Sequence, residues 1–152
     1  MAYEITLTTS MAIMVLFALS LNFITGFCGQ ISLGHAAFMG VGAYTTAMMI
    51  KAGTPMLATL PVAGLLAGLL GFVVGLASLR VREDFLAITT MGVVFLFVGI
   101  VRQQDALGGA VGISGIPASS LGRVGFMVLC IVLAAGFAVF STVIKRSWMG
   151  YV

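Results

Sequence analysis

Few residues in this chain carry side chains that could do chemistry, and most of them lie in one short stretch. His35 is the only histidine, and no second histidine or acidic residue lies near it in sequence to complete a metal site or a catalytic triad. Cys28 and Cys130 are far apart in apolar surroundings, without ligand spacing, which is typical of small core residues. We therefore predict no catalytic residues, no metal site and no cofactor. The remaining candidates are neutral hydrogen-bonding side chains: Asn22, Gln30, Ser32 and His35.

The composition places these polar groups in a membrane. Of 152 residues, 61% are hydrophobic and only 7% are charged, whereas a soluble domain carries about 25% charged residues. The uncharged run between Glu4 and Lys51 is about twice the ~20 residues that one helix needs to cross the hydrocarbon core. Since open strands would leave backbone groups unpaired in lipid, the runs should be helices. We predict an all-α integral membrane protein, a polytopic bundle of about five transmembrane helices. The charges are too few to suggest a nucleic-acid partner.

The predicted helices form one membrane domain over residues 1–152. Their ranges are about 5–24, 30–50, 56–79, 85–102 and 125–144. A glycine-rich break separates the first two helices, and Pro55 suits the start of the third. Glu83 and Asp84 carry the negative charge that suits the start of the fourth.

The longest interruption is an external loop at 105–123, which is rich in glycine and serine and should contain sharp turns. It is apolar enough to lie against the membrane surface or to fold back into the bundle, and we expect a structured connector. Its motif residues are Gly108, Gly109, Gly112, Ser114, Gly115 and Pro117.

The polar group at 22–35 admits two interpretations. Polar side chains at membrane depth are costly and indicate a site or a translocation path. Alternatively, Gln30 and Ser32 cap the start of a helix and His35 bonds to a neighbouring carbonyl group. The spacing alone leaves both interpretations open.

Small residues recur at spacings of three and four along two predicted helices, as at close helix–helix contacts in membranes. We predict that both rows are packing seams. They consist of Ala36, Gly40, Ala43 and Ala47 in one helix and Gly64, Gly68, Gly71 and Gly75 in the next.

The distribution of Lys and Arg favours one orientation. Five crossings place four basic residues on the side of Arg80 and the C-terminus, and three on the side of Lys51. The side with more basic residues is expected to be cytoplasmic. The N-terminus with Glu4 is then external, and the first apolar run is read as a retained helix.

Several motifs are identified as those of a known family. The stretches ALSLNF (18–23), GFCGQISLGHAAF (26–38) and GVGAYT (40–45) resemble the membrane permease of branched-chain amino acid ABC importers, LivM type. LRVR (79–82) with FLAIT (85–89), and GISGIP (112–117), resemble two further motifs of that family in the same order. The resemblance covers nearly the whole chain.

The chain departs from the family pattern in two places. LGGAVG (107–112) has apolar residues where the family has Thr and Asn, and Glu83 stands where a glycine is common. Family members are about twice as long, and SWMG (147–150) matches only the opening of their ATPase-coupling segment. The resemblance therefore implies an incomplete permease, its N-terminal half.

The resemblance also implies a function and partners. Such a permease pairs with a second homologous permease subunit and two cytoplasmic ATPase subunits, which bind ATP, and a periplasmic substrate-binding protein delivers the solute. It lies in the lipid bilayer of the bacterial inner membrane and performs no bond chemistry, so it is no enzyme. Gln30, Ser32 and His35 would then offer neutral hydrogen-bonding groups along the path.

Two alternatives remain open at this point. A permease of the same class could carry urea, short amides or another small polar nutrient. The chain could instead be a small stand-alone membrane protein with a structural or regulatory role.

Overall fold

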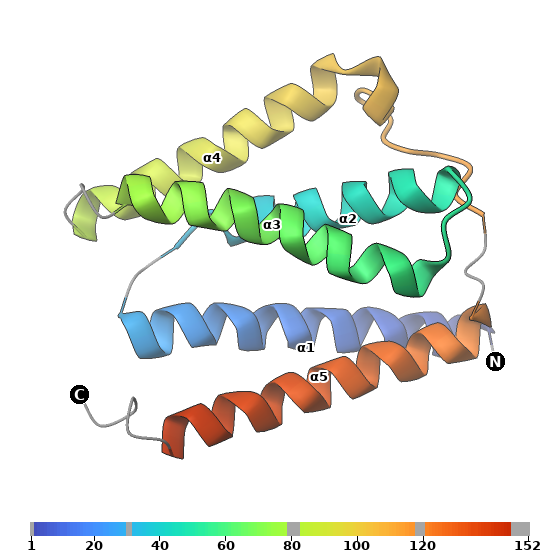
Figure 1. Cartoon of the computed structure of the whole chain (residues 1–152), viewed down its shortest axis with the longest axis horizontal. Coiled ribbons are helices and arrows are strands. Elements are labelled where there is room, and N and C mark those ends of the chain that lie inside the picture. Colours follow the sequence, from blue (N-terminus) through green and yellow to red (C-terminus); the bar gives the residue numbers. More distant parts are fainter. Residues whose placement is uncertain (1, 30–31, 79–82, 118–120, 147–152) are drawn as a thin grey trace. The chain divides into compact units, whose positions relative to one another are not determined.

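The computed structural model describes residues 2–29, 32–78, 83–117 and 121–146. These residues form five α-helices, with one short 3₁₀-helix before the last and no strand. The prediction of an all-helical membrane bundle is confirmed. The α-helices are α1 (Ala2–Cys28), α2 (His35–Lys51), α3 (Met56–Ser78), α4 (Glu83–Gln103) and α5 (Gly122–Arg146), and the 3₁₀-helix is η1 (Asp105–Leu107) (Figure 1).

The first two helices differ most from the predicted ranges. α1 continues through Gly26 to Cys28 and ends where Gly29 adopts a positive φ of 64°, the left-handed conformation with which glycine commonly ends a helix. α2 begins at His35 and not at Gln30, because the backbone N–H of Leu33 bonds to a side chain of α4 and not within a helix. The break between the two helices is therefore displaced toward the C-terminus from its predicted place.

Four helices among the described residues are long and apolar enough to cross a membrane. They are α1, α3, α4 and α5. α2 has 17 residues and extends about 25 Å at the α-helical rise, which is shorter than the ~30 Å hydrocarbon core. Among the described α-helices, α2 is the one whose length alone does not show that it can cross the membrane.

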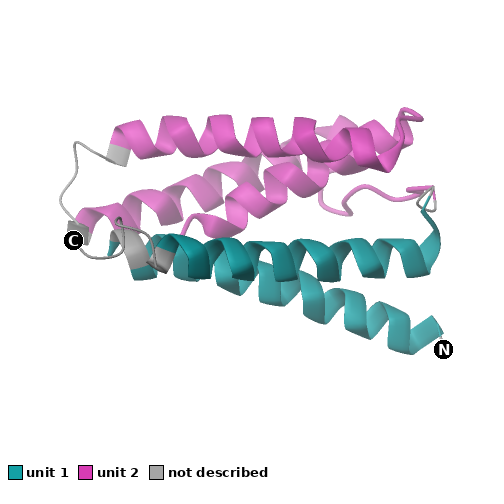
Figure 2. Ribbon diagram, turned by 60° about the horizontal axis from the view of Figure 1, so that its bottom comes forward, with its two compact units in different colours: residues 1–30, 121–152 teal, residues 31–120 magenta. Residues whose placement is uncertain are grey.

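The chain divides into two compact units: residues 1–30 with 121–152, and residues 31–120 (Figure 2). In the first unit, α1 and α5 run parallel. Near their beginnings Tyr3 and Arg123 line one cavity of about 620 Å³. Near their ends Phe23 packs against Phe137, with ring centroids 6.1 Å apart, and against Phe140 at 6.3 Å.

The second unit contains α2, α3 and α4. The chain turns back from α2 into α3 through residues 52–55, where Gly53 has a φ of 88° and α3 starts directly after Pro55, as predicted. Thr59 at the start of α3 is fully buried, and its hydroxyl donates to the carbonyl of Met56 at 2.7 Å. α4 runs beside α2 in the same direction, because Leu33 before α2 contacts Thr90, and Gly40, farther along α2, contacts Phe97, farther along α4.

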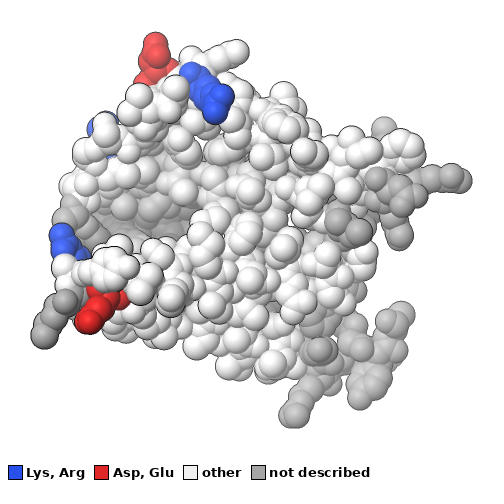
Figure 3. Space-filling model, turned by 180° about the vertical axis from the view of Figure 1, so that it is seen from behind, with Lys and Arg blue, Asp and Glu red and all other residues white. Residues whose placement is uncertain are grey.

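The described charged side chains lie at or near helix ends, and the other described surface in view carries no charge (Figure 3). Large apolar side chains are exposed along α1, α3, α4 and α5. Such surfaces suit lipid, because a helix satisfies its own backbone groups there.

Candidate functional site at the two ends of helix α2

The break before α2 is held by one side chain of α4. The backbone N–H of Leu33 donates to Oγ1 of Thr90 at 3.1 Å, and this hydroxyl donates to the carbonyl of Ala87 at 3.0 Å. Thr90 is only 3% exposed. A Cβ at Gly34 would lie 3.1 Å from both Cβ and the carbonyl oxygen of Thr90, so glycine permits this close approach.

His35 is the first residue of α2 and is half-buried. Its ring lies edge-on to the ring of Phe38, with centroids 6.2 Å apart and an interplanar angle of 90°. The imidazole is thus at the junction between the irregular segment and the helix, next to the contact that Thr90 makes.

The four polar residues singled out in the sequence do not all fall in one place. Ser32 and His35 flank the contact of Leu33 and Gly34 with α4, within one unit. Asn22 belongs to α1 in the other unit, where it is exposed and its Oδ1 would lie 3.0 Å from a Cβ at Gly26. Gln30 lies outside the described residues. That these side chains line a path stays a prediction.

A second contact joins the middle of α2 to α4. The ring of Phe97 lies over Gly40, where an added Cβ would be 2.7 Å from Cζ of that ring and closer still to Cε1. Phe97 also meets the ring of Tyr44 edge-on, with centroids 5.9 Å apart. Gly40 therefore receives an aromatic side chain of the neighbouring helix.

The two rows of small residues differ in their surroundings. In α2, Gly40 takes the ring of Phe97, whereas Ala36 and Ala43 are exposed and Ala47 is half-buried. In α3, a Cβ added at any glycine of the row would meet no described atom within 4 Å. This holds for Gly64, Gly68, Gly71 and Gly75. Their role as a packing seam stays a prediction.

The glycine-rich loop lies over the other end of α2. After η1, positive φ angles at Gly108 (84°), Gly109 (55°), Gly112 (79°) and Gly115 (73°) make the sharp turns that the sequence predicts. The turns are closed by backbone bonds, including the N–H of Gly112 to the carbonyl of Gly108 at 3.2 Å. Pro117 and Gly115 are exposed.

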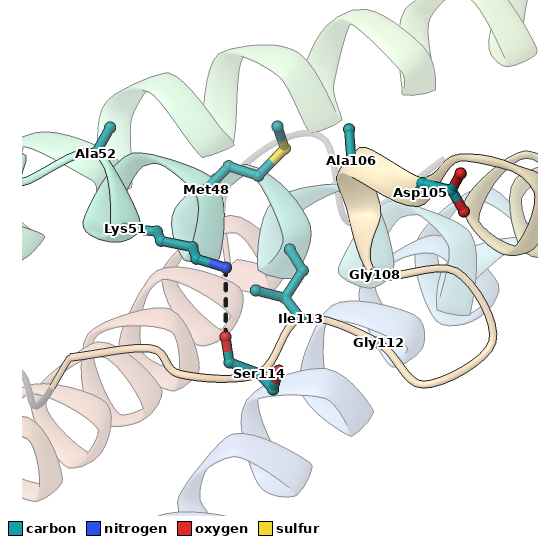
Figure 4. A pocket seen from close by; sticks show the side chains of 9 residues that line it. All are labelled: Met48, Lys51, Ala52, Asp105, Ala106, Gly108, Gly112, Ile113 and Ser114. Atoms are coloured by element: carbon teal, nitrogen blue, oxygen red, sulfur yellow. Dashed lines mark hydrogen bonds between the residues drawn. The ribbon is translucent and has the colours of Figure 1, made fainter.

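Lys51, the last residue of α2, ties this loop to the helix. Its Nζ donates to the carbonyl of Ser114 at 3.4 Å (Figure 4). The two residues line a cavity of about 300 Å³, in which the carboxylate of Asp105 points away from Lys51. The other lining residues are Met48, Ala52, Ala106, Gly108, Gly112 and Ile113.

A second cavity, of about 310 Å³, lies under the same loop toward α4. Tyr44, Phe97 and Arg102 line it together with loop residues from Gly109 to Gly112. Residues near the ends of α2 and α4 thus line the two cavities together with residues of the loop.

Three residues of these contacts were not singled out in the sequence. Thr90 is a polar residue inside an apolar run, a signal that could have drawn attention to it. Phe97 and Tyr44 gave no such signal, because an aromatic residue in a membrane helix is common on lipid-facing and packed surfaces alike. Cys130 is buried, with 8% exposure, as expected for a small core residue. No group of three His, Cys, Asp or Glu side chains forms among the residues that the structure describes.

The amino-acid sequence matches one family over nearly its whole length. Residues 4–152 match the family described as branched-chain amino acid transport system / permease component. The chain is 38% identical over 121 residues to the high-affinity branched-chain amino acid transport system permease protein LivM of Escherichia coli (strain K12). It is 36% identical over 124 residues to LivM of Salmonella typhimurium (strain LT2).

These matches cover 76% and 78% of this chain and 28% of each relative. No solved structure matches the chain. Both ends of α2, with the motif before it and the glycine-rich loop beyond it, lie inside the matched residues. A permease component is a transport protein and not an enzyme. The chain belongs to the family of permease components of branched-chain amino acid transport systems, as a multi-pass membrane protein.

Proposed function

We propose that this chain forms part of a permease subunit of an ABC importer that moves branched-chain amino acids across the bacterial inner membrane. The observation that carries the proposal is the family match over residues 4–152. It includes the break before α2 and the loop after α4, the irregular segments at opposite ends of one short helix.

The proposed path uses backbone and neutral side chains. Broken helices at membrane depth supply free backbone groups to a transported solute in many transporters. Ser32 and His35 at the break, with Asn22 and Gln30, add neutral hydrogen-bonding groups beside apolar walls. Such a surface suits an amino acid with an apolar side chain, because it neither holds the solute by a fixed charge nor leaves its polar groups unpaired.

The proposed partners supply energy and selectivity. A second homologous permease subunit completes the path, two cytoplasmic ATPase subunits bind and hydrolyse ATP, and a periplasmic binding protein delivers the solute. The chain itself takes no cofactor and makes or breaks no covalent bond.

Uptake of labelled leucine tests the proposal. Cells that lack this chain are compared with cells in which it is restored, with the partner genes present in both. We expect accumulation to fall on deletion, to return on restoration, and to stay low when the ATPase partner carries a substitution that prevents ATP hydrolysis. Excess isoleucine or valine should compete with leucine.

Two results would contradict the proposal. Unchanged leucine accumulation after deletion would exclude this solute class. Competition by urea or short amides but not by valine would assign the chain to a permease for small polar nutrients.

A further inference from the structure

We infer that Thr90 of α4 is a positioning residue of the proposed translocation path, because its hydroxyl holds the non-helical segment 32–34 that precedes α2. The inference rests on the proposed function for its consequence in transport. The contact itself is independent of what the protein carries.

We infer the depth of the segment in the membrane from its contact with the apolar span of α4 (Phe85–Gln103). Thr90 follows Phe85, where the apolar span of α4 begins, by five residues, which places it about 7.5 Å along the helix axis. Its partners Leu33 and Gly34 must lie at a similar depth. Non-helical backbone is tolerated there only where protein or a wet cavity satisfies its polar groups.

The Thr90 hydroxyl satisfies a backbone N–H group of this segment, and it both accepts and donates a hydrogen bond. Oγ1 accepts the N–H of Leu33 at 3.1 Å and donates to the carbonyl of Ala87 at 3.0 Å. The side chain is 3% exposed, so water has little access to replace it. Leu33 precedes Gly34, the N-cap residue of α2, so the hydroxyl pairs an N–H group of the non-helical segment and does not cap the helix itself.

The contact fixes where α2 begins. With Leu33 bonded to α4, and a Cβ at Gly34 only 3.1 Å from Cβ and the carbonyl oxygen of Thr90, the helix starts at His35. Ser32 and His35 are therefore placed relative to α4 by one hydroxyl. A movement of α4 during transport would be passed directly to the break.

Three variants separate this role from the loss of a hydroxyl in general. Thr90→Val keeps the shape and removes the hydroxyl, and Thr90→Ser keeps the hydroxyl. Thr89→Val is the matched control, because Thr89 donates to the carbonyl of Phe85 within its own helix at 2.9 Å. Gly34→Ala disturbs the same contact from the other side and serves as a second test.

The experiment uses the complete reconstituted permease complex with Cys28→Ser and Cys130→Ala as background. A cysteine at position 32 (Ser32→Cys) reports the break through its rate of reaction with a maleimide. We expect Thr90→Val and Gly34→Ala to raise this rate about tenfold, the scale of one buried N–H left unpaired. Thr90→Ser and Thr89→Val should leave it unchanged.

Transport of labelled leucine, measured without the added cysteine, gives the second readout. The maximal rate should fall about tenfold in Thr90→Val, with little change in the half-saturating leucine concentration. Equal labelling in Thr90→Val and Thr89→Val would overturn the inference, and so would altered labelling with normal transport. If the wild-type complex does not carry leucine, the proposed function fails, while the labelling comparison still decides whether Thr90 holds the break.

Discussion

At the scale of single residues, two positions on α2 have different physical roles. Gly40 is a packing residue: the ring of Phe97 occupies the space that a side chain would fill. His35 is a polar residue at the point where irregular chain becomes helix, and it packs on Phe38. The role of Gly40 is tested by measuring thermal stability, and the role of His35 by measuring transport.

Replacing Gly40 by alanine should destabilise the protein by about 1–3 kcal/mol, the usual cost of overpacking. The added Cβ collides with Phe97, whose ring also contacts Tyr44 and cannot move without losing that contact. Thermal unfolding of the purified chain in detergent measures the change. Gly42→Ala is the matched control, because nothing lies within 4 Å of its Cβ position. Equal melting temperatures for the two variants would refute the close contact, whereas partial recovery in Gly40→Ala with Phe97→Leu would support it.

Replacing His35 by leucine should lower the leucine uptake of the complete permease about tenfold, if the imidazole offers hydrogen bonds to the path. Leucine keeps the apolar contact with Phe38 and removes both ring nitrogens. Uptake is normalised to the amount of protein in the membrane, with His35→Gln as the variant that keeps a polar group. Normal uptake at normal membrane levels would assign His35 a structural role.

At the scale of elements, α2 and α3 use small residues differently. In α2, the ring of Phe97 occupies the space where a side chain of Gly40 would lie. In α3, no described atom lies within 4 Å of the Cβ position of any glycine in the row. Open glycines in a membrane helix are where another helix could approach closely. No described neighbour fills the space beside the α3 row, and we expect a helix of a partner subunit to pack there.

Alanine at Gly68 or Gly71 should therefore leave the melting temperature of the chain unchanged or slightly raised, since alanine favours helix by up to about 1 kcal/mol. A larger side chain separates folding from association. We expect Gly68→Leu to retain the fold of the isolated chain and to reduce co-purification with the proposed second permease subunit. Leu69→Ala, at an exposed neighbouring residue, is the control. Normal co-purification of Gly68→Leu would contradict the prediction that the α3 row is a packing seam.

At the scale of the whole molecule, the direction of the helices determines how often the chain crosses the membrane. α1 and α5 run parallel, since their beginnings share a cavity and their ends share an aromatic cluster. Two parallel spans begin on the same side, so an even number of crossings must precede α5. α1, α3 and α4 are long and apolar enough to give three, and we expect α2 to supply the fourth in spite of its 17 residues.

This topology predicts which positions are labelled from the same side of the membrane. Single cysteines in place of Tyr3, Ala52 and Gln104 should react with an impermeant maleimide added outside intact cells, and one in place of Ala77 should react only after permeabilisation. Cys28→Ser and Cys130→Ala provide the background. If α2 turned back without crossing, Tyr3→Cys and Ala52→Cys would be labelled from opposite sides.

Much of this architecture follows from local sequence. Uncharged runs of about twenty residues have one stable form in lipid, the helix, so the helices and their class are predictable from composition. Pro55 and the loop glycines are equally local, because proline and glycine restrict or extend the conformations of their own backbone. The polar group at 22–35 was visible for the same reason, as an exception in an apolar chain.

The tertiary structure decided what depends on residues distant in sequence. α2 starts at His35 because a hydroxyl 57 residues beyond Leu33 takes its N–H group, and no periodicity in residues 30–35 carries that information. The spacing of small residues is the same in α2 and α3. The ring of Phe97 packs on Gly40 of α2, whereas no described side chain packs on the glycine row of α3. The sequence determined which segments are long and apolar enough to cross a membrane, namely α1, α3, α4 and α5, since this depends on each segment alone. The fold determined which of their groups meet and assigned α2 its expected crossing, since both depend on pairs of segments.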